Sequence, residues 1–314
     1  MLNLLARLAA NRNFLLLAAV VLGISLPSVA KYLKDATLPV IMVIMTVSAV
    51  RIPSDSFISL RKLVGPMLLG VGLNYILLSI VMLGLARLLV PQQEMWAGFV
   101  LVAVAPPGFA IVPFTFILGG DVALSTLASV GGYLATLILA PAMAVLLIGG
   151  AALDPLRILI VATELIVLPM VVSRLLIVTG IGRRMDRWIG TIINWGFFIV
   201  LLTVVGLNRA VLIDQPRVFW ALAAVGLTSI FGVGSLIMFA SRRFVPERAK
   251  RISLTLLGSM KNSGWASVTA LALIGEEASA PGAVCSVANV LYLLWLGWLE
   301  GRGAKARHRK AEPD

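Results

Sequence analysis

The sequence has few charged residues, one histidine and one cysteine. Charged side chains make up 13% of the 314 residues and hydrophobic side chains 60%, which excludes a protein whose surface is mostly solvated. Cys285 stands alone, so no intrachain disulfide can form, and we interpret it as a small core residue. His308, the only histidine, lies near the C-terminus, which excludes a histidine metal site or histidine general base within a membrane. We therefore expect no metal site and no cofactor.

Long apolar runs recur along the chain. Between Phe14 and Leu299, runs of about twenty residues alternate with short polar stretches, and this length spans a hydrocarbon layer ~30 Å thick. The predicted spans are 14–30, 36–50, 64–89, 95–118, 122–148, 156–174, 188–207, 218–240, 252–275 and 280–299. A β-barrel would alternate polar and apolar residues, and these runs do not. The sequence predicts an all-α polytopic membrane protein with ten transmembrane helices.

The basic residues predict the orientation of these helices. Ten spans place both termini on one side, and Lys and Arg are enriched in cytoplasmic loops. With the N-terminus inside, nineteen of the 26 basic residues are cytoplasmic, six lie outside and Lys261 lies within a span. We expect cytoplasmic termini and, from the short loops and lack of a transit peptide, a bacterial inner membrane. The first apolar segment is expected to be retained as a span, and the basic tail 301–314 to touch anionic lipid rather than nucleic acid.

Two interruptions occupy the same place in the two halves of the chain. Residues 1–150 and 151–300 each hold five spans, and an odd number makes the second repeat inverted. The fourth span contains Ala105-Pro106-Pro107-Gly108, and the ninth contains Met260-Lys261-Asn262-Ser263-Gly264. Proline and glycine are common in membrane helices, but a proline removes a backbone donor, and the freed groups need partners at membrane depth. We expect two inverted five-helix repeats whose fourth and ninth helices are broken and cross each other.

Lys261 is the first candidate for a functional residue. A lysine at the centre of a spanning helix costs at least ~3 kcal/mol on insertion scales, so it normally faces a cavity, a partner or a substrate. It follows Arg251 by ten residues, or ~15 Å of helix, which is deep for a side chain that reaches back to the interface. Snorkelling remains the alternative. Asn262 and Ser263 either cap the broken helix or line a substrate cavity.

Glu164 is the other ionisable residue expected deep in the membrane, in the sixth span. Three roles are open for it: a counter-ion to Lys261, a group in proton coupling or substrate release, or a residue in a wet crevice. Weaker candidates for the lining of a substrate cavity are Phe109, Thr115, Ser259 and Asn289.

Three stretches of the sequence resemble the bile acid:sodium symporter family. They are Ala105–Gly108 followed by Gly120–Ser125, then Met260–Gly264, and Leu168-Pro169 with Arg174 in the sixth span. With the topology included, the resemblance covers nearly the whole chain. It implies a carrier that works by alternating access, in which spans three to five and eight to ten move against spans one, two, six and seven. The substrate, a small organic anion, would be held near the crossing.

The sodium ligands of that family are mostly replaced. Val112, Leu257 and Lys261 stand at positions where the family has Asn, Glu and Gln ligands, whereas Ser125 and Ser129 match its hydroxyl ligands. Asn74 stands near a third-span Gln of the family. Two unit charges ~4 Å apart repel by about 4 kcal/mol at an effective dielectric of 20, which would abolish a millimolar sodium affinity. We expect the ammonium to replace the ion, and sodium-coupled symport is the alternative.

The protonation of Lys261 and the substrate stay open at this stage. A charged lysine would neutralise a substrate carboxylate in a uniporter or exchanger, whereas a lysine that loses its proton on burial would carry a proton. A keto acid, a pantoate-like acid or a steroid-type carboxylate would fit. A channel is the alternative to a carrier. A Ser-Lys hydrolase with Ser259 or Ser263 is not expected, because residues two apart on a helix do not face each other.

Overall fold

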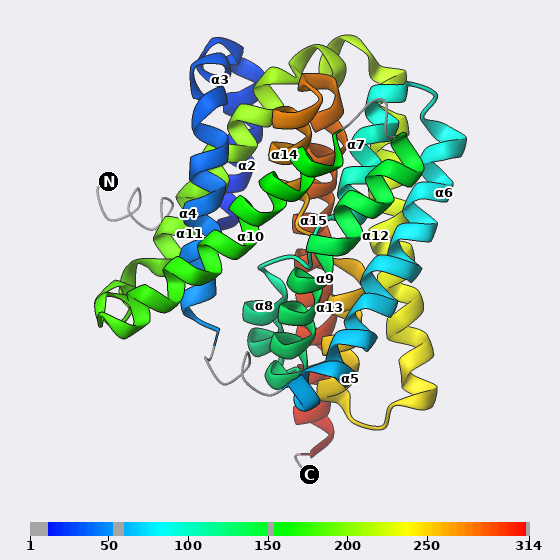
Figure 1. Cartoon of the computed structure of the whole chain (residues 1–314). Coiled ribbons are helices and arrows are strands. Elements are labelled where there is room, and N and C mark those ends of the chain that lie inside the picture. Colours follow the sequence, from blue (N-terminus) through cyan, green and yellow to red (C-terminus); the bar gives the residue numbers. More distant parts are fainter. Residues whose placement is uncertain (1–11, 53–59, 150–153, 312–314) are drawn as a thin grey trace, which may run out of the picture.

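The computed structural model describes residues 12–52, 60–149 and 154–311, and within these ranges the chain is helical with no strand (Figure 1). The first elements are α2 (Arg12–Ser25), α3 (Pro27–Leu33), the short helix η1 (Lys34–Ala36), α4 (Thr37–Val50), α5 (Leu60–Val71), the π-helical turn η3 (Gly72–Leu78) and α6 (Ser79–Leu89). Next come α7 (Gln93–Val104), α8 (Ile111–Leu118) and α9 (Val122–Ile148). The remaining elements are α10 (Pro155–Val178), α11 (Ile181–Leu207), the π-helical turn η4 (Ala210–Asp214), α12 (Pro216–Phe244), α13 (Arg248–Ser259), α14 (Ser263–Leu273) and α15 (Glu276–Ala311).

Seven stretches of helix are long and apolar enough to cross a membrane. They are Pro27–Val50, Leu63–Leu89, Val122–Ile148, Leu156–Val178, Ile181–Leu207, Pro216–Phe244 and Glu276–Glu300. Three further apolar stretches are shorter, Phe14–Ser25, Gln93–Val104 and Ser263–Leu273. The prediction of an all-α chain with several membrane-spanning helices is confirmed, and the chain is an integral membrane protein. The basic tail 301–314 lies only partly within the described residues, because α15 is followed to Ala311.

The ends of the long helices follow from local sequence. Asp121 caps α9 by accepting a hydrogen bond from the Leu124 amide at 2.9 Å, and Asp154 caps α10 in the same way through Leu156. Gly119 and Gly180 adopt left-handed φ angles of 71° and 75°, a conformation in which glycine ends a helix without strain. These short connections keep consecutive helices adjacent, which positions α8 directly beside α9.

The helices pack in two groups. The first helix group consists of α2, α3, α4, α10 and α11, and the second helix group consists of α5 to α9 with α12 to α15 (Figure 1). Within the first group, α11 packs on α2, α3 and α4, and α10 packs on α4. Within the second group, α9 packs on α5 and α7, and α15 packs on α7, α12 and α14. The two groups meet along α10 and α9, α11 and α15, and α14 and α4, where the cavities described below lie.

Candidate functional site

Two helix interruptions lie against each other in the second helix group. One separates α7 from α8 and the other separates α13 from α14, at the positions predicted from Pro106-Pro107-Gly108 and from Met260 to Gly264. The Gly108 amide donates to the Met260 carbonyl at 3.2 Å, and the Asn262 amide donates to the Pro106 carbonyl at 2.8 Å. Pro107 and Lys261 thereby form an antiparallel bridge. Two freed carbonyls and two freed amides are thus satisfied between the interruptions, as expected.

Small residues allow this close contact. Pro107 packs against Gly132 of α9, where a Cβ atom would collide with the proline ring. A Cβ on Gly108 would lie 3.2 Å from the Lys261 carbonyl oxygen, closer than ordinary van der Waals contact. The Ala103 carbonyl near the end of α7 accepts a hydrogen bond from the Ser79 hydroxyl at 2.8 Å. The interruption is therefore bonded on more than one side and has little freedom to shift.

The Lys261 side chain is buried, with 3% of the residue exposed, and its ammonium points into the second helix group. Nζ donates to Asn74 Oδ1 at 2.9 Å and lies 3.5 Å from the Ala105 carbonyl oxygen. It also lies 4.3 Å from the centroid of the Tyr75 ring. An amide oxygen, a carbonyl at the C-terminal end of α7 and an aromatic face all favour a cation. These three acceptors match the three N–H groups of an ammonium.

Asn74 is oriented by its own partners. Its Nδ2 donates to the carbonyl oxygens of Leu257 and Met260 at 2.8 and 3.0 Å. The amide nitrogen therefore faces two acceptors, and the amide oxygen faces Lys261. A flipped amide would lose all three hydrogen bonds, which fixes the orientation of Asn74. Asn74 lies in the π-helical turn η3, a geometry that often marks functional sites in membrane and soluble helices.

Tyr75 is held in place by α9. Its hydroxyl donates to the Gly132 carbonyl at 2.9 Å and makes a further close contact with the Thr136 hydroxyl. The ring is thus fixed beneath the ammonium. Neither Tyr75 nor Ser79 was predicted as a site residue, although a Tyr directly after the polar Asn74 in an apolar span was a signal that could have suggested Tyr75.

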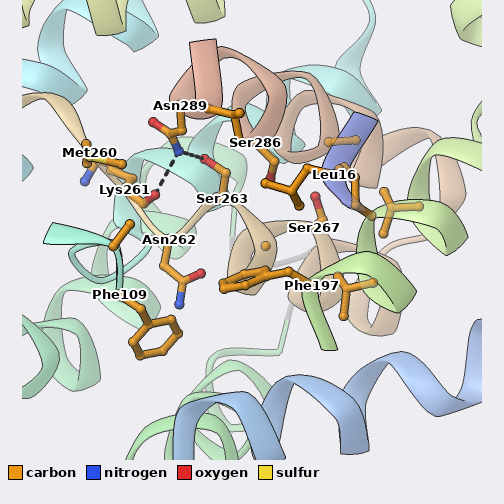
Figure 2. Close-up of a pocket in the computed structure, with 18 of the residues that line it drawn as sticks. Leu16, Phe109, Phe197, Met260, Lys261, Asn262, Ser263, Ser267, Ser286 and Asn289 are labelled. Carbon is orange, nitrogen blue, oxygen red and sulfur yellow. Dashed lines mark hydrogen bonds between the residues drawn. The ribbon is translucent and has the colours of Figure 1, made fainter. Parts of the chain in front are cut away.

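Two asparagines contact the beginning of α14, and Figure 2 shows the hydrogen bonds of one of them, Asn289. Asn262 Oδ1 accepts a hydrogen bond from the Trp265 amide at 3.1 Å, so the capping role predicted for Asn262 is confirmed. Asn289 of α15 donates to the Lys261 carbonyl at 3.1 Å and to the Ser263 hydroxyl at 3.0 Å. Its Oδ1 is buried and has no partner among the described residues.

A small cavity of about 70 Å³ lies beside this cap, between the two helix groups (Figure 2). Its polar lining comes from Lys261, Asn262, Ser263, Ser267, Ser286 and Asn289, and Met260, Gly108 and Phe109 complete the wall on the side of the interruptions. Leu16 of α2 and Phe197 of α11 face them from the first helix group. The N-terminal end of α14 and the unpaired Oδ1 of Asn289 make this a polar site in an apolar surrounding.

A larger cavity of about 600 Å³ opens between the same two groups. Its lining includes Met45 and Ser48 of α4, Arg51 just after α4, Val112 and Phe116 of α8, Thr126, Ser129 and Tyr133 of α9, Ile166 and Met170 of α10, and Ile193 and Phe197 of α11. This volume is in the range of ligand-binding pockets. Phe109 and Phe197 line both cavities, so the two rings stand between them.

The larger cavity is mostly apolar but carries a few hydroxyl groups. The hydroxyl oxygens of Ser129 and Ser48 are buried and have no hydrogen-bond partner in the described part of the chain. At the end of α4, Arg51 lies 3.5 Å from Asp186 of α11, and both side chains line the cavity. Neither serine oxygen is exposed to the cavity, so a ligand would bond to it only after a rotation of the side chain, which would give the hydroxyl a hydrogen bond that the protein alone does not give it.

The two serines predicted to act together do different things. Ser129 faces the larger cavity, whereas Ser125 lies 2.9 Å from the Thr115 hydroxyl, which itself donates to the Ile111 carbonyl at 2.7 Å. Both Thr115 and Ser125 are fully buried and line neither cavity. Their bond ties α8 to α9.

Glu164 lies apart from Lys261. Its side chain on α10 is half-buried, and among the described residues it forms no ion pair with the ammonium, whose side-chain partner is Asn74. The interpretation of Glu164 as a counter-ion therefore lacks the contact that it requires. A Ser-Lys pair also lacks the contact that it requires, because Ser259 donates to the Thr255 carbonyl and Ser263 accepts from Asn289.

Neither a protein-family model nor a curated protein matches this chain. The described residues contain no group of three or more His, Cys, Asp or Glu side chains in reach of one metal ion. The chemistry of the site therefore follows from three features of its geometry. These are a buried lysine held by neutral acceptors, a polar helix end, and an adjoining cavity of ligand size.

Proposed function

We propose that this protein is a secondary transporter that moves a small organic anion by alternating access and does not couple to sodium. In this proposal the chain has ten transmembrane helices in two inverted repeats, residues 1–150 and 151–300. It lies in a bacterial inner membrane with both termini in the cytoplasm. The arrangement corresponds to the carrier architecture of the bile acid:sodium symporter family, with the first helix group as one moving body and the second as the other.

The paired interruptions support this architecture. Helices α7 and α8 have 12 and 8 residues, and α13 and α14 have 12 and 11, so each pair has the length of one span divided in two. With α2 and α3 as the first span, these pairs are the fourth and the ninth. Broken helices that meet near the middle of a membrane are typical of carriers, because their ends face a shared substrate site.

The environment of Lys261 is the observation that carries the proposal. Its ammonium occupies a site made of Asn74 Oδ1 at 2.9 Å, the Ala105 carbonyl at 3.5 Å and the ring of Tyr75. Such a set of neutral oxygens and a π face would suit a bound monovalent cation, and the lysine supplies that cation from within the chain. A sodium ion beside it would meet a repulsion of about 4 kcal/mol at ~4 Å.

The positions of Val112 and Leu257 support the loss of sodium coupling. Leu257 is fully buried and offers only its carbonyl, which already accepts a hydrogen bond from Asn74. Val112 stands on the wall of the larger cavity without an oxygen ligand. Sodium needs several oxygen ligands in one place, and two of the expected ones are hydrocarbon here.

The substrate is proposed to be a carboxylate with an apolar body. The N-terminal end of α14 borders the small cavity and favours a negative group, and Lys261 is among the residues that line this cavity. The larger cavity adds apolar walls and the free hydroxyls of Ser129 and Ser48. In the proposed orientation Arg51, an exposed residue of this lining, would lie on the cytoplasmic side.

Binding of a carboxylate library to the purified protein tests the proposal. Thermal unfolding would be measured in sodium chloride and in choline chloride, for the wild type and for Lys261→Gln. We expect at least one carboxylate to raise the midpoint of the wild type equally in both salts and to lose this effect in Lys261→Gln. A wild-type response that requires sodium would contradict the proposal and restore ordinary symport.

Lys250→Gln is the matched control for this experiment. Lys250 is exposed at the beginning of α13, pairs with Glu247 at 3.2 Å and lines neither cavity. The same loss of one positive charge there should leave carboxylate binding unchanged. An equal loss in both variants would assign the effect to net charge rather than to the site.

A further inference from the structure

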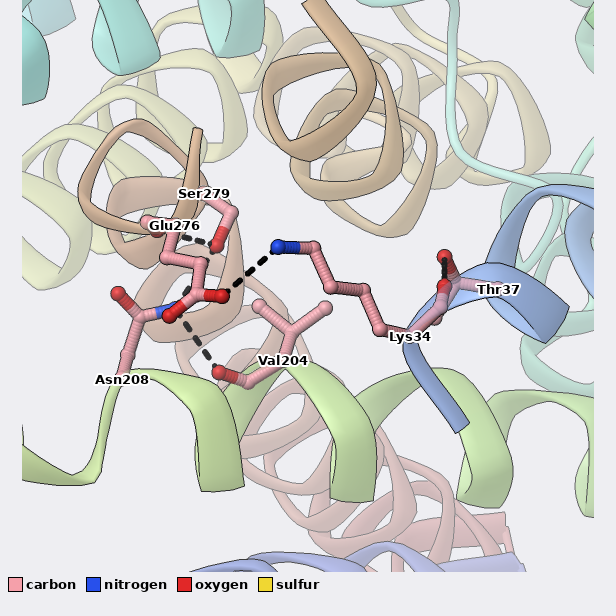
Figure 3. Close-up of polar contacts among 6 residues, drawn as sticks. All are labelled: Lys34, Thr37, Val204, Asn208, Glu276 and Ser279. Atoms are coloured by element: carbon pink, nitrogen blue, oxygen red, sulfur yellow. Dashed lines mark hydrogen bonds and ion pairs between the residues drawn. The ribbon is translucent and has the colours of Figure 1, made fainter. Parts of the chain in front are cut away.

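A set of polar bonds joins the two helix groups at the end of the molecule opposite the larger cavity (Figure 3). Lys34 Nζ of η1, in the first group, lies 2.8 Å from Glu276 Oε1 at the start of α15, in the second group. Asn208 Nδ2 at the end of α11 donates to the Ser279 hydroxyl of α15 at 2.8 Å. We name these four residues the latch.

Further hydrogen bonds within each helix group hold the latch residues in place. The Thr37 hydroxyl donates to the Lys34 carbonyl at 2.7 Å, which fixes the turn before α4. The Ser279 hydroxyl donates to the Glu276 carbonyl at 2.6 Å, and Asn208 also donates to the Val204 carbonyl at 2.9 Å. Asn208 is buried, and its Oδ1 has no partner in the described part of the chain. Each side of the latch is therefore held by its own helix, and two bonds of the latch cross between the groups.

Helix lengths place the latch and the mouth of the larger cavity at opposite ends. Lys34 precedes α4 and Arg51 follows it, so the 14 residues of α4 separate them by at least ~21 Å. On α11, Asp186 at the mouth and Asn208 at the latch are 22 residues apart, or ~33 Å of helix. The groups are thus separated by a cavity at one end and bonded together at the other.

We infer that the latch is the gate that keeps the far end of the transport path closed while the larger cavity is open. This inference rests on the proposed carrier function, in which the two helix groups move relative to each other. In the alternate state the groups would separate at α15 and close over the larger cavity. Both crossing bonds would break, because each joins a residue of one group to a residue of the other.

Paired cysteine reporters in detergent test the gate without any substrate. Leu201 of α11 lines the small cavity about two turns from Asn208, and Met170 of α10 lines the larger cavity. Each would be changed to Cys in a Cys285→Ala background, and its rate of reaction with a maleimide would be measured. In Lys34→Gln we expect the rate at Leu201→Cys to rise about 2- to 5-fold, the range set by an exposed ion pair, and the rate at Met170→Cys to fall.

Opposite changes in the two reaction rates distinguish a gate from a weakened fold. A variant that only loosens packing would raise both rates, which would contradict the inference, as would unchanged rates in both Lys34→Gln and Asn208→Ala. The charge swap Lys34→Glu with Glu276→Lys should restore the wild-type rates. Lys250→Gln, which removes an exposed ion pair within one helix group, should change neither rate. Because no carboxylate is present, a failure of the gate is distinguishable from a failure of anion binding.

Discussion

A double-mutant cycle between Asn74 and Lys261 measures the interaction energy of the two side chains. It thereby tests the proposal that the Lys261 ammonium takes the place of a bound cation. Asn74→Ala removes the oxygen that accepts from Nζ at 2.9 Å and also removes a donor from the carbonyls of Leu257 and Met260, of which Met260 keeps the Gly108 amide. A buried polar group without a partner costs about 1–3 kcal/mol, and a hydrogen bond to a charged group contributes about 1.5–3 kcal/mol. We expect Asn74→Ala to lower the free energy of unfolding by about 4 kcal/mol in the wild type.

The cost should be smaller when the ammonium is absent. In Lys261→Met only the two carbonyls depend on Asn74, so Asn74→Ala should then cost about 2 kcal/mol, which leaves a coupling of about 1.5–3 kcal/mol. The free energies would be measured by reversible denaturant titration in mixed micelles, followed by tryptophan fluorescence. Asn208→Ala serves as the control, because Asn208 shares no hydrogen-bond partner with Lys261 and should show additive effects. A coupling below about 0.5 kcal/mol between Asn74 and Lys261 would refute the reasoning.

Three further variants probe other parts of the site. Ser129→Ala should leave the unfolding midpoint unchanged, because its hydroxyl has no partner within the described residues, while a carboxylate that uses this hydroxyl should bind several-fold more weakly in a thermal-shift titration. Gly132→Ala should destabilise the protein by about 1–3 kcal/mol, because the new Cβ collides with Pro107, whereas Gly84→Ala meets no atom within 4 Å and should be neutral in the same denaturant titration. Glu164→Gln should change the free energy of unfolding by less than about 0.5 kcal/mol and leave carboxylate binding intact. A large loss in either measurement would indicate that Glu164 is part of the site.

The helical class and the positions of the interruptions could be predicted from the sequence. Apolar runs of spanning length give helices by composition alone, Pro106-Pro107 cannot continue a helix without loss of backbone bonds, and Asn262-Ser263 are residues that favour the start of a helix. The antiparallel contact of the two interruptions followed from the need of freed backbone groups for partners at membrane depth. Local chemistry therefore sufficed for these features.

The partners of individual side chains could not be predicted, because they depend on how distant helices rotate. Lys261 was expected to face a substrate or Glu164, yet its ammonium turns to Asn74 and Tyr75. The crossing bonds of the latch link Lys34 to Glu276, 242 residues apart, and no sequence period relates them. Likewise Ser125 and Ser129 share a helix face in the sequence pattern, but packing of α8 covers one and leaves the other on the cavity wall.

The most direct test of the central claim is a sodium titration of the purified wild-type protein without substrate. Thermal unfolding would be followed up to ~300 mM sodium, with choline replacing it at constant ionic strength. A site with an affinity of ~3 mM would contribute about 2.7 kcal/mol at the highest concentration and raise the midpoint by several degrees. Because we propose that Lys261 occupies the place of the cation, we predict no difference between sodium and choline at any concentration. A saturable stabilisation by sodium would contradict the account.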